Sequence, residues 1–142
     1  MADTTRTQSL RQAGLKRTPQ RESILRVLEE SDRPLSAEEI RTRMDEGRSG
    51  LPTIYRNLER FTQEGWAEGL VGQDQVMRYV RCRSVHHHHH LQCEGCGRTV
   101  EVEGCGLAQA LKHMEEVTGF CITGHRLQLS GLCPACQAEK TR

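Results

Sequence analysis

Two pairs of cysteines constrain the fold of this 142-residue chain more than any other feature. Cys93 and Cys96 form one C-x-x-C motif, and Cys133 and Cys136 form a second. A two-residue spacing lets both thiolates of a turn bind one ion, and two such turns supply the four sulfurs of a tetrahedral zinc site. The sequence therefore predicts a structural zinc ion that joins two distant segments of a small domain.

The composition indicates that the hydrophobic core is thin. The chain has one Trp, two Tyr and two Phe but 13 Gly, and small cores of this kind usually need a metal ion or a partner subunit. The seven cysteines follow an N-terminal segment without a secretory apolar region, so we expect a reducing, cytoplasmic location. In that compartment paired cysteines are metal ligands or redox groups more often than disulfides.

Charge and hydropathy exclude two classes of protein. The net charge of +1 excludes a polycation that binds nucleic acid along its whole length, although residues 1–26 carry six basic residues against two acidic ones. No apolar run approaches the roughly 18 residues that a transmembrane helix needs. We therefore expect no membrane partner.

Three helices are predicted in the first half of the chain, over residues 19–31, 36–45 and 52–64. The first begins after Thr18, a hydroxyl N-cap followed by proline. The second begins with a capping box formed by Ser36 and Glu39. The third has an apolar stripe at helical spacing and ends at Gly65, which is placed as a C′ glycine.

Two short strands, Trp66–Val71 and Val76–Arg81, follow the third helix. Three helices and a two-stranded hairpin are the layout of a winged helix-turn-helix, whose last helix can enter the DNA major groove. On that helix Tyr55 and Arg56 avoid or flank the apolar stripe, and such side chains can contact phosphate and base edges. The alternative is that Tyr55 packs against the body of the domain and that Arg56 is an ordinary solvated charge. Many winged helices bind proteins instead of DNA.

The second half is predicted to be a small α/β domain. Between the cysteine pairs an apolar stripe from Leu107 to Val117 predicts a helix that ends at Gly119, and Phe120–Ser130 is predicted to be extended. The fold class is therefore α+β, with a winged-helix domain over residues 1–82 and a metal-binding domain over residues 83–142.

Five consecutive histidines, His86–His90, precede the first cysteine pair. Side chains alternate along a strand, so His88 and His90 would face one way and His87 and His89 the other, which allows two metal sites. Cys82 lies just upstream, and one cysteine with two histidines favours zinc or copper. The nearest carboxylate candidates for a fourth ligand are Glu68 and Glu101.

Two cysteines remain outside these groups. Cys121 is predicted to pack as a small buried hydrophobe, and Cys105 has no assigned role.

An enzyme is a distant alternative. The order His113-Met-Glu115 and then Cys133-x-x-Cys136 is superficially that of a zinc deaminase, in which the glutamate moves protons. That interpretation leaves the first cysteine pair and the histidines without a role, and Leu132 stands where such a site has proline. We therefore expect no enzymatic activity.

The chain resembles the ferric-uptake-regulator family of metal-sensing repressors from about residue 10 to residue 137. The resemblance rests on the order of six motifs, which are Gly14-Leu-Lys-Arg-Thr-Pro-Gln-Arg21, Leu35-Ser-Ala-Glu-Glu-Ile40, Thr53-Ile-Tyr-Arg-Asn-Leu58, His86–His90 with Cys93-x-x-Cys96, Gly124-His125-Arg126-Leu127 and Gly131-Leu-Cys-Pro-Ala-Cys136. It implies a homodimer with a C-terminal dimerisation domain that binds palindromic operator DNA when loaded with metal. Tyr55 and Arg56 match the family's DNA-contacting pair, and Lys16 matches its minor-groove basic residue.

The resemblance also bears on which metal is sensed. Iron- and peroxide-sensing branches use a histidine at the position of Pro34, whereas the zinc-uptake-regulator branch places a cysteine where Cys82 stands. The implied regulatory site, which holds an exchangeable zinc ion, consists of Glu68, Cys82, His88 and His90. Glu101 matches a carboxylate ligand of several members and is an alternative to Glu68. Control of zinc-acquisition genes is implied; sensing of iron, manganese or peroxide is the alternative.

A further family site uses His87, His89 and His125 with a carboxylate at the position of Ala108. Three outcomes are open here: the site has three protein ligands, Glu103 or Cys105 supplies the fourth, or the site is absent.

Overall fold

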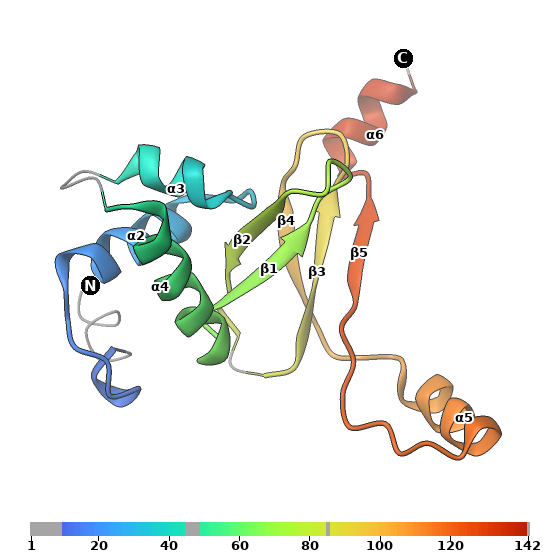
Figure 1. Ribbon diagram of the computed structural model, residues 1–142. Coiled ribbons are helices and arrows are strands. Elements are labelled where there is room, and N and C mark those ends of the chain that lie inside the picture. The colour runs from blue at the N-terminus through green and yellow to red at the C-terminus, as the bar shows by residue number, and fades with distance from the viewer. Residues whose placement is uncertain (1–9, 45–48, 85, 142) are drawn as a thin grey trace. The chain divides into compact units, whose positions relative to one another are not determined.

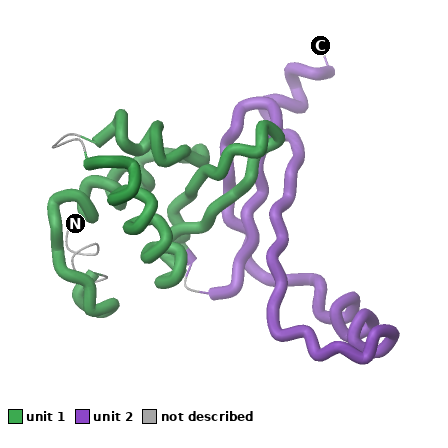
Figure 2. Tube along the Cα trace, in the orientation of Figure 1, with its two compact units in different colours: residues 1–83 green, residues 84–142 purple. Residues whose placement is uncertain are grey.

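The computed structural model describes residues 10–44, 49–84 and 86–141, and it divides into two compact units. Unit 1 comprises residues 1–83 and unit 2 residues 84–142 (Figure 2). Figure 1 labels the elements of unit 1, which are α2 (Pro19–Glu30), α3 (Ala37–Arg43), α4 (Leu51–Gln63), β1 (Ala67–Val71) and β2 (Met77–Arg81). The elements of unit 2 are β3 (His88–Cys93), β4 (Thr99–Glu103), α5 (Ala108–Thr118), β5 (Gln128–Gly131) and α6 (Pro134–Lys140).

The predicted helix boundaries in unit 1 are largely confirmed. The Thr18 hydroxyl accepts from the backbone N–H of Arg21, and the capping box at the start of α3 has both of its hydrogen bonds. Gly65 follows α4 with φ of +74°, a left-handed conformation that glycine adopts without steric cost. Helix α3 ends at Arg43, and the predicted end at Asp45 lies outside the described residues.

The core of unit 1 is apolar and fully enclosed. Helix α4 buries Ile54, Leu58 and Phe61, which recur at steps of four and three residues as one face of a helix requires. They meet Ile24 and Leu28 from α2 in one hydrophobic cluster. Burial of this face turns the opposite side of α4 toward solvent.

The wing is a two-stranded antiparallel sheet extended by one bridge. β1 pairs with β2 from Ala67 opposite Arg81 to Val71 opposite Met77, and Leu35 forms an isolated bridge with Tyr79. These are the parts of the predicted winged helix-turn-helix, which is confirmed.

The tip of the wing is held by an ion pair. Both guanidinium NH groups of Arg78 donate to the carboxylate of Asp74, over 2.8 and 2.7 Å. This bond lowers the pKa of Asp74 from 3.8 to about 2, so the carboxylate keeps its charge and its bond to Arg78 in acid that would protonate an ordinary aspartate.

Unit 2 is a three-stranded sheet with the order β4-β3-β5 (Figure 1). β3 is antiparallel to β4 and parallel to β5, and β5 pairs only with residues His90–Cys93. The prediction of one extended strand over Phe120–Ser130 is therefore wrong for most of its length. The first residue of this segment to pair with β3 is Gln128, which lies opposite His90. Earlier in the segment, Ile122 donates its backbone N–H to the side-chain oxygen Oε1 of Glu115 and not to a neighbouring strand.

Unit 2 has almost no hydrophobic core. Among residue 84 and residues 86–141, the only buried side chains are His89, His90 and Cys93. The apolar stripe of α5 is exposed, with Val117 66% accessible, because this helix stands away from the sheet (Figure 1). Cys121 is exposed rather than buried, since no packed core lies beside it to receive it.

Within the described residues, no helix combines the length and the apolar character that crossing a membrane requires.

Candidate metal centres

The four paired cysteines of unit 2 come together in one cluster. Cys93 ends β3, Cys96 lies in the following turn, and Cys133 and Cys136 lie at the start of α6. Their sulfur atoms all lie within 4.8 Å of one another, and Cys96 Sγ is 3.8 Å from Cys133 Sγ. A zinc ion with bonds of about 2.3 Å to four sulfurs gives S···S edges of about 3.8 Å. The cluster therefore has the dimensions of a tetrahedral zinc site.

A glycine makes room for this cluster. A Cβ atom built on Gly95 would lie 2.8 Å from Cys136 Sγ, closer than carbon and sulfur can approach. Any larger residue at position 95 would therefore clash with Cys136, so the turn between Cys93 and Cys96 requires glycine there.

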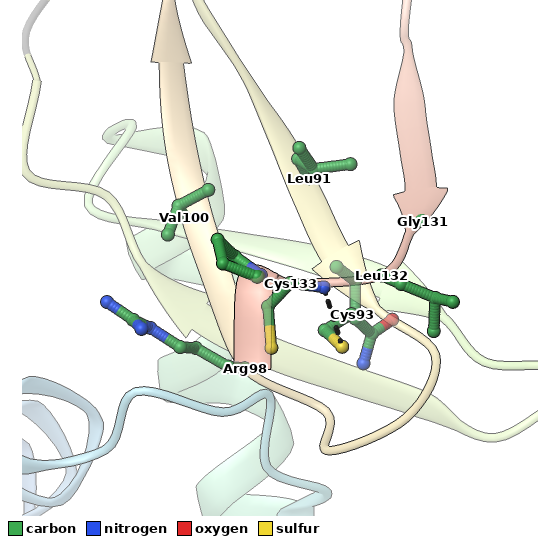
Figure 3. A pocket seen from close by; sticks show the side chains of 9 residues that line it. Leu91, Cys93, Arg98, Val100, Gly131, Leu132 and Cys133 are labelled. Atoms are coloured by element: carbon green, nitrogen blue, oxygen red, sulfur yellow. Dashed lines mark hydrogen bonds between the residues drawn. The ribbon is translucent and has the colours of Figure 1, made fainter. Parts of the chain in front are cut away.

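Hydrogen bonds within the cluster shift the acidities of Cys93 and Cys136 in opposite directions. The backbone N–H of Cys133 donates to Cys93 Sγ over 3.2 Å (Figure 3), and this bond is the main reason that the pKa of Cys93 falls to about 6. A hydrogen bond with the Cys133 side chain raises the pKa of Cys136 to about 12. At pH 7 the Cys93 sulfur is therefore mostly thiolate, whereas Cys136 keeps its proton until a cation displaces it.

A second cluster gathers three imidazoles and one thiol. The Nε2 atom of His87 lies 3.0 Å from that of His89 and 3.1 Å from that of His125, and the latter two are 3.3 Å apart. Cys105 Sγ lies 3.3 Å from His125 Nε2. Sequence reasoning left Cys105 open as one of several options, because no spacing rule links it to a histidine twenty residues away.

The remaining predicted ligands are distributed over both units. In unit 1 Glu68 lies on β1 and Cys82 directly follows β2, and their ligand atoms are within 4.8 Å of each other. In unit 2 the rings of His88 and His90 lie with centroids 5.1 Å apart, on the opposite side of β3 from His89.

The hydrogen bonds of His88 prepare it to bind a metal. Its Nδ1 lies 2.8 Å from the carbonyl oxygen of His86, which can only accept, so Nδ1 carries the proton. Nε2 therefore presents a lone pair, and it is buried with no hydrogen-bond partner among the residues that the structure describes. A buried lone pair of this kind fits a cation.

Glu101 lies beside the same pair of histidines. It is opposite His90 in the β3–β4 ladder, and its Oε1 is 3.9 Å from His90 Nε2. Its other oxygen accepts from the backbone N–H of Ser84 over 3.0 Å.

The side chains predicted to contact DNA lie on one surface region of unit 1. On α4, Tyr55 is half exposed at the flank of the buried face and Arg56 is exposed on the opposite side, and Lys16 is exposed ahead of α2. Arg21 connects the two segments, because it donates to Asn57 Oδ1 over 3.0 Å and to the carbonyl of Lys16 over 2.7 Å.

The deaminase arrangement is not present. Both cysteines of its motif belong to the four-sulfur cluster, whereas His113 is in none of the ligand clusters of the described residues. The Glu115 carboxylate accepts from Ile122.

A winged helix-turn-helix together with clusters of metal ligands is the combination of parts that a metal-responsive transcriptional regulator requires, although a fold alone does not establish a function. The chain belongs to the ferric uptake regulator family, which it matches over residues 12–130. This is a family of regulators rather than enzymes, and the predicted resemblance is confirmed.

Known proteins across the family are similar to this chain. The peroxide-responsive repressor PerR of Staphylococcus aureus is 36% identical over 131 residues, which cover 91% of this chain and 87% of PerR. The Vibrio cholerae ferric uptake regulator has a TM-score of 0.61 at 32% identity, over 89% of this chain and 98% of that one. A zinc uptake regulator complexed with zinc and DNA has a TM-score of 0.80 over 98% and 95% of the two chains; at 23% identity it shows the shared fold.

Proposed function

We propose that this protein is a zinc-responsive repressor in the cytoplasm that binds double-stranded operator DNA as a homodimer and controls zinc-acquisition genes. The observation that carries the proposal is the thiol of Cys82 beside the carboxylate of Glu68 in the winged-helix unit. With His88 and His90 of unit 2 they offer one sulfur, one oxygen and two nitrogens. This donor set suits zinc better than manganese or magnesium.

Two zinc ions have distinct roles in this proposal. The four-cysteine cluster holds the structural ion, which stabilises unit 2. Glu68, Cys82, His88 and His90 hold the exchangeable ion. Glu101 then supports His90 as an outer carboxylate, since one of its oxygens is already occupied by Ser84.

The regulatory ligands come from two domains. We assign residues 1–82 to the winged-helix domain and residues 83–142 to the metal-binding dimerisation domain. A cation held by all four ligands links the domains and fixes the angle between them. In a dimer this angle sets the separation of the two α4 helices, and operator half-sites require one separation. The exposed stripe of α5 suits a partner subunit as its cover.

DNA recognition is assigned to the exposed side of unit 1. Arg56 and Tyr55 contact base edges and phosphate in the major groove, and Lys16 reaches the minor groove. Arg21 acts as a positioning residue, because it holds the Lys16 backbone against α4.

A second candidate is sensing of peroxide through iron or manganese, which the 36% identity to a peroxide-responsive repressor favours. The proposal for zinc is supported against it by two residues. Pro34, at the position of the histidine used in those branches, has no side-chain donor and is buried. Cys82 adds a thiolate, which favours zinc over iron(II) and manganese(II).

Operator binding as a function of free metal tests the function. DNA sites are selected from random duplexes with zinc-loaded protein, and affinity is then measured by fluorescence anisotropy with zinc, manganese or iron(II). We expect zinc to tighten binding by about 5- to 150-fold, the usual range of allosteric coupling. Arg56→Ala should weaken binding at every zinc concentration, by about 1–3 kcal/mol. Equal affinity with and without zinc contradicts the proposal, and iron-dependent binding that peroxide abolishes supports the second candidate.

A further inference from the structure

We propose that Arg81 is a positioning residue for the exchangeable cation, because it ties the backbone of Cys82 to Glu29 of α2. The inference deepens the function proposed above and rests on it in one respect, since it takes Cys82 as a ligand of that cation. All three residues belong to unit 1.

Cys82 lies just beyond the end of the wing. The last pair of the β1–β2 ladder is Ala67 opposite Arg81, and unit 1 ends at Arg83. The backbone N–H of Cys82 donates to the carbonyl of Trp66 over 2.8 Å. A binding site requires its ligands to be held within about 0.5 Å of the productive geometry, so a ligand beyond the last ladder pair needs further bonds that hold its backbone.

The guanidinium of Arg81 supplies such bonds. Its Nη1 donates to the carbonyl of Cys82 over 2.9 Å and to the carbonyl of Trp66 over 2.7 Å. Because the Trp66 carbonyl also accepts from the Cys82 N–H, both backbone groups of Cys82 are held in one small network. A guanidinium has donors and no lone pair, so Arg81 can position the ligand but cannot bind the cation itself.

Both neighbours of Cys82 also contact one residue of α2. Arg81 Nε lies 3.6 Å from Glu29 Oε1, in an ion pair whose side chains are 16% and 25% exposed. Arg83 donates to the backbone carbonyl of the same glutamate over 3.2 Å. The last turn of α2 has no basic residue of its own, and cations are favourable beside the carbonyls at a helix C-terminus. The chain on either side of Cys82 is thus anchored to the end of this helix.

The helix that provides the anchor is firmly packed. Helix α2 buries Ile24 and Leu28 in the apolar core of unit 1. The ion pair of Arg81 with Glu29 is partly exposed, and such pairs contribute little to the stability of a domain. Removal of the pair should therefore displace Cys82 while unit 1 stays folded.

Cobalt(II) titration of the full chain tests the inference. The four-cysteine cluster is filled with zinc, and Cys105→Ser removes the thiol of the histidine cluster, so that a near-ultraviolet thiolate-to-cobalt band reports binding at Cys82. Arg81→Met keeps most of the aliphatic stem and loses the donors. We expect it to weaken cobalt binding by about 10- to 100-fold, the usual cost of removing a group that holds a metal ligand.

Two further variants show whether Arg81 acts through Glu29. Glu29→Gln should weaken cobalt binding in the same direction, and adding it to Arg81→Met should cost nothing further, because both changes break one ion pair. The matched control is Arg60→Met, at an arginine that pairs with Glu64 on α4 over 2.8 Å, and it should leave the cobalt affinity unchanged.

Operator binding separates a positioning role from a general loss of structure. In Arg81→Met the zinc concentration for half-maximal operator binding should rise by about 10- to 100-fold, whereas the affinity at saturating zinc should equal that of wild type. The proposal is overturned by an absent cobalt band, by an unchanged cobalt affinity in Arg81→Met or Glu29→Gln, or by a loss of operator affinity that saturating zinc does not restore. The function proposed above fails separately, if zinc leaves operator binding unchanged in wild type although cobalt binds at Cys82.

Discussion

Replacing Cys136 with serine is expected to release the structural zinc ion and to unfold most of unit 2. In the described part of this unit only His89, His90 and Cys93 are buried, so the hydrophobic effect contributes little to its stability. Structural zinc sites contribute roughly 10–16 kcal/mol in small metal-dependent domains, about the whole stability of an ordinary one. Loss of one thiolate should therefore remove the main stabilising interaction.

Hydrogen exchange resolved along the chain measures this effect, with zinc content determined in parallel. Amides of β3, β4 and β5 should lose their protection in Cys136→Ser. Those of α2 and α4 should keep theirs, because unit 1 has its own apolar core. Cys121→Ser is the matched control, since its thiol is exposed and outside the clusters. Native protection of the β3–β5 ladder in zinc-free Cys136→Ser protein would show that the cluster is dispensable.

Cys82→Ser is expected to abolish the response of operator binding to zinc while the structural ion remains bound. A serine hydroxyl stays protonated at neutral pH and is a poor zinc ligand, so the regulatory set loses its softest donor. The roughly 5- to 150-fold effect of zinc on operator affinity should shrink to less than about twofold. Anisotropy titrations at buffered free zinc give both affinities for each protein.

The control for this substitution is Cys105→Ser, the same chemical change in a different cluster. It should retain the zinc response, because Cys105 lies with His87, His89 and His125. A full zinc response in Cys82→Ser would remove Cys82 from the regulatory site.

Local sequence rules predicted the elements that local interactions determine. The ends of helices are local features, because their unpaired backbone groups are satisfied by nearby residues. Side chains do this at Thr18 and Ser36, and a left-handed glycine ends the helix at Gly65. The wing likewise follows from two short alternating strands. The four-cysteine cluster came from spacing, because each C-x-x-C turn brings two sulfurs together whatever the fold around it.

Properties that depend on distant parts of the chain were not predicted. The length of β5 depends on which residues of β3 are available to pair with it. The sequence around Phe120 carries no information about those distant residues. Cys121 was expected to be buried on the average behaviour of cysteine, but α5 and the segment after it lie outside any packed core. Cys105 lies beside His125, which is twenty residues further along the chain, and a contact between residues so far apart cannot be read from the local sequence.

The central claim is that exchangeable zinc fixes the angle between the two domains of each subunit. Pulsed electron paramagnetic resonance measures it, with spin labels on noncanonical residues at exposed Glu38 and Glu139 and an excess of unlabelled subunits. With only the structural site filled, we predict a broad distance distribution that narrows on addition of the second zinc ion and stays broad in Cys82→Ser. An identical distribution with and without the second ion would contradict the account.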